Sequence, residues 1–142
     1  MKRITESLFP LDEQVFETVI KNDADKLKGL LSSGWFFFHK TRHLDSWNSG
    51  GDTLLTLAVR NGNTAIIDIL LEGKADINAP DRNGHTPLHT AIFSNNLELV
   101  KYLVSKGANV MKPTRDSRTP LWLAVVNNQA DIIKFLKSRG AI

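Results

Sequence analysis

The sequence predicts an all-α fold, a solenoid built from helix–turn–helix units, and two observations lead to this prediction. First, three similar eight-residue segments begin 33 residues apart with no gap between them: Gly51–Ala58, Gly84–Ala91 and Ser117–Ala124. Second, apolar residues follow each segment at helical spacing, at Ile67/Val100/Ile133 and Leu70/Leu103/Leu136. A period of this length indicates short units that bury their apolar faces against one another.

The first helix of each unit is marked by residues typical of a helix start. Thr86 and Thr119 can cap it, because a hydroxyl oxygen accepts a hydrogen bond from a free backbone N–H of the first turn. Pro87 and Pro120 then fall at the first helical position, where the missing N–H costs nothing.

The second helix has its own start and stop signals. Asn63 and Asn96 precede the second apolar run and can cap it. Gly107 and Gly140 can supply the left-handed residue that ends it. Asn83-Gly84 is a tight-turn signal between two units. Each unit is therefore expected to hold two short helices.

A fourth, degenerate unit can be recognised upstream. Thr18–Gly34 aligns with Ala58–Lys74 at an offset of 40 residues, which places Leu27, Leu30 and Leu31 at core positions. We therefore predict one domain over residues 1–142 with four repeats: repeat 1 at about 11–50, repeat 2 at 51–83, repeat 3 at 84–116 and repeat 4 at 117–142. Repeat 1 has about seven extra residues and a polar outer surface, as an end repeat requires. Repeat 4 is expected to act as its own cap, with Lys134, Lys137 and Arg139 facing outward from the last helix.

Residues 51–142 closely resemble the ankyrin repeat family, whose period is also 33 residues. The resemblance is carried by Gly-His-Thr-Pro-Leu-His-Thr-Ala at 84–91, by Gly73–Ala79 and by Gly107–Val110. It implies antiparallel helix pairs with projecting β-turn fingers, a concave face lined by fingers and first helices, and a role in protein binding. It also implies that the His89 imidazole bonds neighbouring backbone.

The sequence departs from the family pattern at a few positions. Leu54 replaces the helix-starting proline, and Thr56 and Trp122 replace the histidine of the Thr-Pro-Leu-His segment. Asn95 and Asn128 stand where Gly62 keeps the usual glycine. Because asparagine tolerates a left-handed backbone better than most residues, these turns should survive.

The composition excludes several classes of function. With 42% hydrophobic and 23% charged residues among 142, the chain is typical of a soluble globular domain. It has no cysteine, which excludes disulfides, thiolate zinc sites and cysteine nucleophiles. The net charge is +3 without a block of basic residues, and no apolar run approaches the roughly 20 residues that span a membrane. We expect no membrane association and a monomer when free, in the cytoplasm or alternatively in the nucleus.

The concave face is the predicted binding site, because stacking does not require its side chains. The resemblance places there the finger residues Ser49, Asp52, Arg82, His85, Arg115 and Arg118, and the helix residues Arg60, Asn61, Phe93, Ser94, Val126 and Asn127. Four of these are arginines, and guanidinium groups match carboxylates or phosphates. We therefore predict a protein partner with an acidic segment; the alternative is an ordinary solvated surface.

The enlarged first finger is the second unusual feature. Residues 35–48 contain two Trp and three Phe, and aromatic residues are enriched at protein interfaces. We predict that Phe38 and Trp47 contact a partner. Trp35 and Phe37 align with Ala75 and Ile77, which favours packing at the base of the finger or under the N-terminal segment.

Catalytic and metal-binding patterns are not found. His39 and His43 would have metal-ligand spacing on a helix, but this segment is predicted to be a loop. Asp45 lies nearby in the sequence, but there is no third well-placed donor. The sequence has neither a Gly-x-Ser-x-Gly elbow nor a phosphate-binding loop. We expect no enzyme activity, no metal and no cofactor.

The leading hypothesis is a non-catalytic protein-interaction module: an adaptor, an inhibitor or a targeting subunit. Three alternatives remain open: nucleic-acid binding through the basic finger row, the recognition subunit of an enzyme complex, and a bacterial or viral effector that binds a host protein. The repeat frame alone does not identify the partner.

Overall fold

The computed structural model describes residues 10–32 and 44–142 of the chain, and within these ranges it contains eight helices and no strand. The helices are α1 (Pro10–Ile20), α2 (Ala24–Ser32), α4 (Leu54–Asn61), α5 (Thr64–Glu72), α6 (Pro87–Phe93), α7 (Leu97–Ser105), α8 (Pro120–Val126) and α9 (Ala130–Ser138). Each predicted repeat holds two of them.

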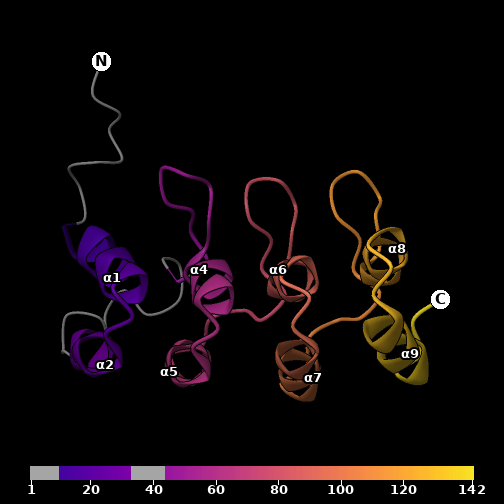
Figure 1. Ribbon diagram of the computed structural model, residues 1–142. Coiled ribbons are helices and arrows are strands. Elements are labelled where there is room, and N and C mark those ends of the chain that lie inside the picture. The colour runs from indigo at the N-terminus through magenta and orange to yellow at the C-terminus, as the bar shows by residue number, and fades with distance from the viewer. Residues whose placement is uncertain (1–9, 33–43) are drawn as a thin grey trace.

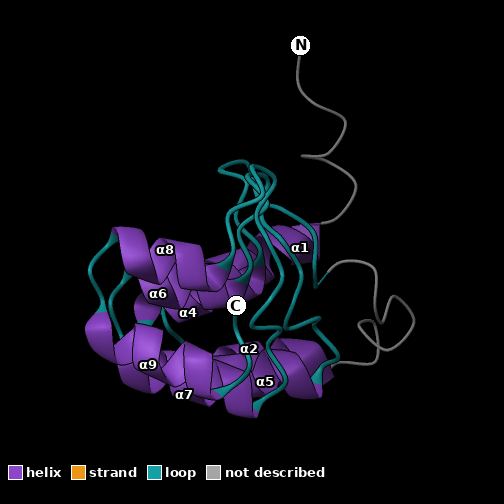
Figure 2. Ribbon diagram, turned by 90° about the vertical axis from the view of Figure 1, so that its right-hand side faces the viewer, coloured by secondary structure: helices purple, strands orange, loops and turns teal. Residues whose placement is uncertain are grey.

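The helices form two parallel rows. Helices α1, α4, α6 and α8 form the inner row and α2, α5, α7 and α9 the outer row, as Figure 1 shows. Each inner helix contacts the next inner helix along the row as well as its own outer helix. Between the pairs, loops extend away from both rows and lie together as fingers, which Figure 2 shows from the end of the stack. The predicted all-α solenoid is confirmed.

The predicted helix caps are present, and they explain why each helix begins where it does. The side chains of Thr86 and Thr119 accept hydrogen bonds from backbone N–H groups three residues later, and Thr53 does the same at α4. Asn63 and Asn96 cap α5 and α7 in the same manner. Helix α9 differs, because Gln129 makes no cap and instead donates its amide Nε2–H to the Ile92 carbonyl, 2.6 Å away in the preceding repeat.

The hydrophobic core runs between the two rows along the stack. Leu27, Leu70, Leu103 and Leu136, one from each repeat, are fully buried. Leu30 and Leu31 of the degenerate first repeat are partly buried against the same core. Replacing one of the fully buried leucines by alanine would cost about 2–5 kcal/mol of stability.

The turn that joins the two helices of a repeat needs a left-handed residue. Gly62 supplies it in repeat 2 with φ 71°, while Asn95 and Asn128 adopt φ 51° and 55° in repeats 3 and 4. The expectation that asparagine preserves this turn is confirmed. The backbone at this turn is therefore left-handed in all three repeats.

Candidate functional site

The candidate surface consists of the fingers and the inner helices, and the finger tips are closed by the same hydrogen bonds each time. The side chains of Asn48, Asp81 and Thr114 accept the backbone N–H of the residue four positions later, at 2.9, 2.9 and 3.2 Å. Their own N–H groups donate to the carbonyl of that same residue at 2.8–3.0 Å. These later residues are Asp52, His85 and Arg118, three of the predicted site residues. They are therefore held in equivalent positions on three successive fingers.

Successive fingers are also in close contact. The backbone N–H of Arg82 donates to the Gly51 carbonyl at 2.9 Å. Gly84 lies so near the following finger that a Cβ atom there would be 2.6 Å from the Arg115 backbone nitrogen. The backbones that carry Arg82 and Arg115 are consequently fixed by their neighbours, while both side chains are exposed.

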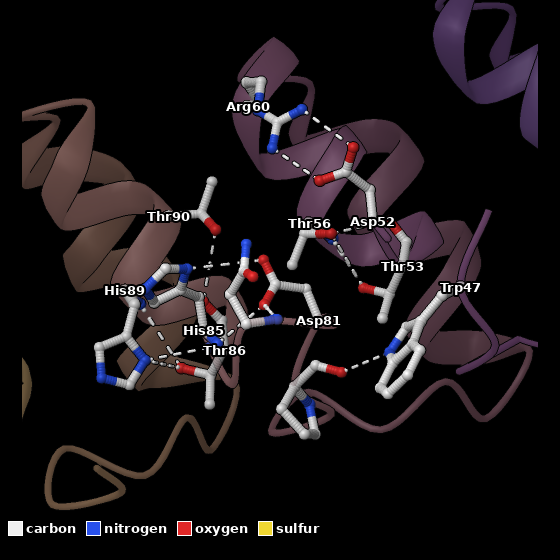
Figure 3. A network of polar contacts seen from close by, with 12 residues as sticks. Trp47, Asp52, Thr53, Thr56, Arg60, Asp81, His85, Thr86, His89 and Thr90 are labelled. Atoms are coloured by element: carbon white, nitrogen blue, oxygen red, sulfur yellow. Dashed lines mark hydrogen bonds and ion pairs between the residues drawn. The ribbon is translucent and has the colours of Figure 1, made fainter. Parts of the chain in front are cut away.

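In repeats 2 and 3 the finger residue meets a residue of its own inner helix eight positions later, and the chemistry of this contact differs between the two repeats. In repeat 2 the Arg60 guanidinium donates to both carboxylate oxygens of Asp52, at 2.7 and 3.3 Å (Figure 3). This hydrogen-bonded carboxylate raises the pKa of Arg60. In repeat 3 the His85 and Phe93 rings meet edge to face with their centroids 5.2 Å apart.

Arg118 of repeat 4 behaves differently from both. Its guanidinium lies over the Trp122 ring, 5.0 Å from the centroid, and Val126 is left exposed beside it. Among the described residues, Arg82, Arg115 and Arg118 form no ion pair, whereas Arg60 does. Of the expected row of four cations, three arginines therefore have no ion-pair partner among the residues that the structure describes.

Two helix residues of the predicted site use their hydrogen-bonding groups within the protein. Asn61 donates its side-chain amide to the Val19 carbonyl of α1 at 3.1 Å. The Ser94 hydroxyl donates to the Thr90 carbonyl at 3.1 Å. Asn127, at the equivalent place in repeat 4, is exposed. The polar helix residues thus contribute less free hydrogen-bonding capacity than their positions suggest.

Large apolar side chains are exposed at the end of the surface formed by repeats 3 and 4. The exposed fractions are 51% for Phe93, 44% for Trp122, 50% for Val125 and 56% for Val126. Phe93 and Val126 are among the predicted site residues, but Trp122 and Val125 are not. Their counterparts in the earlier repeats are buried at 0–1%: Thr56 and His89 for Trp122, and Val59 and Ile92 for Val125. The substitution of Trp122 for the family histidine is the sequence signal that could have drawn attention to this end.

The expectation that repeat 4 acts as its own cap stays a prediction. Lys134, Lys137 and Arg139 of the outer layer are exposed as expected. The inner helix α8 leaves Trp122 and Val125 about half exposed.

Trp47 of the first finger is both anchored and accessible. Its indole Nε1–H donates to the Pro80 carbonyl of the next finger at 2.8 Å, and 46% of the residue is exposed (Figure 3). Phe38 lies outside the described residues, as do Trp35, Phe37, His39 and His43. Ser49 is exposed on the same finger as Trp47.

His89 is the most perturbed titratable group near this surface. Its Nδ1 accepts the backbone N–H of Thr86 at 3.0 Å and lies 2.8 Å from the Thr86 hydroxyl, which also caps α6 (Figure 3). Burial, and to a lesser extent the nearby His85, lower the pKa of His89 to about 4, while the backbone of Arg118 acts in the opposite direction. The imidazole is therefore neutral near pH 7. Its contacts are structural and lie behind the exposed face.

The described residues contain no group of three or more His, Cys, Asp or Glu side chains placed to hold a metal ion. None of the described helices is both long and apolar enough to cross a membrane. The features that the surface does present are guanidinium groups on rigid fingers and apolar side chains on neighbouring helices. Both are suited to holding another molecule.

Comparison with known proteins gives a consistent result. A family model described as ankyrin repeats, in three copies, matches residues 16–114, and a second model for the ankyrin repeat matches residues 116–142. No curated protein matches the sequence.

Proposed function

Because this chain belongs to the ankyrin repeat family, whose members are in general protein-interaction modules, we propose that its concave face binds a partner protein through an acidic segment of that partner. The observation that carries the proposal is the set of three exposed finger arginines, Arg82, Arg115 and Arg118, which lack an ion pair with any described residue. An adaptor, an inhibitor and a targeting subunit would all share this binding step.

The rigidity of the fingers supports the proposal. A partner that binds a mobile loop must order that loop, at a cost of about 1–2 kcal/mol for each residue whose backbone becomes fixed. Here the finger tips are already closed by their own hydrogen bonds and by contact with the neighbouring finger. A carboxylate can therefore meet a guanidinium whose backbone position is already set, and such charge-assisted pairs can be bidentate.

Binding of a nucleic acid through the same arginines is the competing function. Three phosphate contacts would give a salt dependence of about −2.7 in log K against log salt, since each contact contributes about −0.9 on duplex DNA. Raising the salt from 50 to 200 mM would then weaken binding by about 40-fold. A protein partner that also buries apolar surface should lose much less affinity over that interval.

The proposal can be tested by affinity capture with the whole chain. We expect Arg82→Glu/Arg115→Glu to lose the captured partner, because two carboxylates would then face its acidic segment. Lys134→Glu/Lys137→Glu is the matched control, since it makes the same change in net charge on exposed residues of α9. A partner retained equally by both double variants would exclude the finger arginines as its binding site.

The first finger forms a separate arm of the same experiment. Phe38→Ala/Trp47→Ala should weaken capture if the aromatic finger contributes to the interface. Trp47→Phe is a useful companion, because it removes the hydrogen bond to Pro80 but keeps an aromatic ring. Capture that is unchanged by the finger variants and by the arginine variants would show that neither surface is used.

A further inference from the structure

The concave face is not uniform along the stack. At the repeat 2 end, the Arg60 guanidinium donates two hydrogen bonds to the Asp52 carboxylate, so both charges already have a partner. At the equivalent helix position, repeat 3 has Phe93 and repeat 4 has Val126, which are 51% and 56% exposed. A partner would have to break an existing ion pair at one end, whereas at the other end it would cover apolar surface that is now in contact with water.

The exposed apolar residues at this end of the stack lie on two sides of α8. Trp122 and Val125 occupy positions whose counterparts in repeats 2 and 3 are buried at 0–1%, so they belong to the end of the stack. Val126 occupies the position equivalent to Phe93 on α6, the neighbouring inner helix, with which α8 is in contact. We call Phe93 and Val126, which both belong to the face formed by the fingers and the inner helices, the apolar patch. Exposed apolar side chains on neighbouring elements are typical of binding sites.

Positive charge lies on the finger beside this patch. Arg118 covers the Trp122 ring, and Arg115 is exposed on the same finger. Lys112 of that finger is already bonded to the Asn78 carbonyl at 2.8 Å. Asp116 is the only carboxylate between Met111 and Arg118, so the finger beside the patch is net positive. Carboxylates of a partner would therefore be attracted to the rim, while the patch itself offers nothing to a charged group.

We infer that the binding site is confined to repeats 3 and 4, and that its occupant is a peptide segment in which bulky apolar side chains cover the apolar patch and flanking Asp or Glu side chains meet Arg115 and Arg118. This inference rests on the proposed function and narrows it to one part of the face and one class of sequence. A nucleic acid would complement only part of this surface. Its phosphates suit the arginines and its bases can stack on Phe93, but it offers little aliphatic surface to bury against Val126.

Selection from a random 12-residue peptide library displayed on phage, with the whole chain immobilised, tests this inference. The selected peptides should combine Leu, Ile, Phe or Trp with Asp or Glu. Synthetic copies should bind Phe93→Arg and Val126→Arg at least about tenfold more weakly than the wild type, as expected for anchors at the centre of an interface. Both variants introduce the residue that repeat 2 carries at the same position, namely Arg60, and both sites are about half exposed, so the fold should tolerate them.

Two further variants complete the experiment. Asp52→Ala/Arg60→Ala removes the self-paired end of the face and should change the affinity of the selected peptides by less than about twofold. Selection against Arg115→Glu/Arg118→Glu should enrich Lys or Arg in place of Asp or Glu while keeping the apolar residues. Thermal unfolding of each variant separates lost binding from lost folding.

Several outcomes would overturn the inference. They are the absence of any enriched peptide, enrichment without apolar or acidic residues, or full binding to Phe93→Arg. Binding of a labelled single-stranded DNA of 12 nucleotides at 200 mM salt would also overturn the inference if only Arg115→Glu/Arg118→Glu abolished that binding. A nucleic acid would then be the favoured occupant. If affinity capture succeeds while peptide selection fails, the proposed function stands and only the linear acidic occupant is wrong.

Discussion

Acidification should destabilise this protein through His89, a buried residue outside the proposed binding site. The imidazole is fully buried, and its Nδ1 accepts a hydrogen bond from the Thr86 backbone at the start of α6. Protonation would remove this acceptor and place a charge where there is no water. Asp81 favours the charged form, but His85 and Lys112 oppose it, and burial dominates.

The size of the effect follows from the two pKa values. The pKa of His89 is about 4 in the folded protein, compared with an ordinary value of 6.5. Between these values the unfolded chain binds a proton that the folded chain does not, so stability is complete above pH 6.5 and falls as the pH falls toward 4. Each pH unit in this interval costs about 1.4 kcal/mol, so a change from pH 7 to pH 5 should remove about 2 kcal/mol of the free energy of unfolding.

Urea unfolding at pH 7 and pH 5, compared between the wild type and His89→Thr, isolates this contribution. Threonine is the residue of repeat 2 at the equivalent position, where the Thr56 hydroxyl is buried and donates to the Thr53 carbonyl at 2.9 Å. His89→Thr should be less stable at pH 7 but should lose about 2 kcal/mol less than the wild type on acidification, because all other titrating groups are shared. An NMR titration of the His89 ring should give a pKa near 4 directly. A pKa above 6, or equal losses in the two proteins, would refute this account of the histidine.

Two further predictions concern contacts between repeats. Gly107→Ala should cost about 1–2 kcal/mol, measured by urea unfolding, because Gly107 has φ 98°, although a Cβ atom there would meet no atom within 4 Å. Gly84→Ala should cost about 1–3 kcal/mol more, because its Cβ would also lie 2.6 Å from the Arg115 nitrogen; equal costs would show that the fingers can separate freely. Tyr102→Phe should lower the free energy of unfolding by about 1 kcal/mol, since the Tyr102 hydroxyl donates to Asp68 of the preceding repeat. Burial and this contact also raise the pKa of Tyr102, so its ultraviolet titration should begin at higher pH than that of free tyrosine, and an ordinary titration would contradict the contact.

The fold could be predicted from the sequence because its determinants are local and recur. A threonine before Pro-Leu specifies a helix start through contacts within four residues, as the cap at Thr86 shows. The left-handed turns at Asn95 and Asn128 likewise depend mainly on the residue that occupies them. The 33-residue period then places every repeat on the next without further information.

The ion pairing and the exposure of the surface residues could not be predicted in the same way, because they depend on which other residues lie beside each position. Arg60 counts as a free cation in the sequence, yet the fold brings it within 2.7 Å of Asp52, eight residues earlier on the finger. Position 125 is apolar like positions 59 and 92, which predicts a core residue. It is nevertheless half exposed, because no helix of the described chain covers it as α6 and α8 cover the earlier two.

The contrast between constant and variable positions explains how a repetitive fold can acquire a directional binding surface. The stack is held by positions that scarcely change, such as Leu70, Leu103 and Leu136, which are all fully buried. The finger-to-helix contact changes at each step, from the Asp52–Arg60 ion pair to the His85–Phe93 ring contact and then to an arginine over Trp122. Since the finger hydrogen bonds and the left-handed turns recur, this change from paired charge to exposed apolar surface comes from the side chains. A segment bound along the face would therefore meet different chemistry at its two ends, and this difference would fix its direction and register.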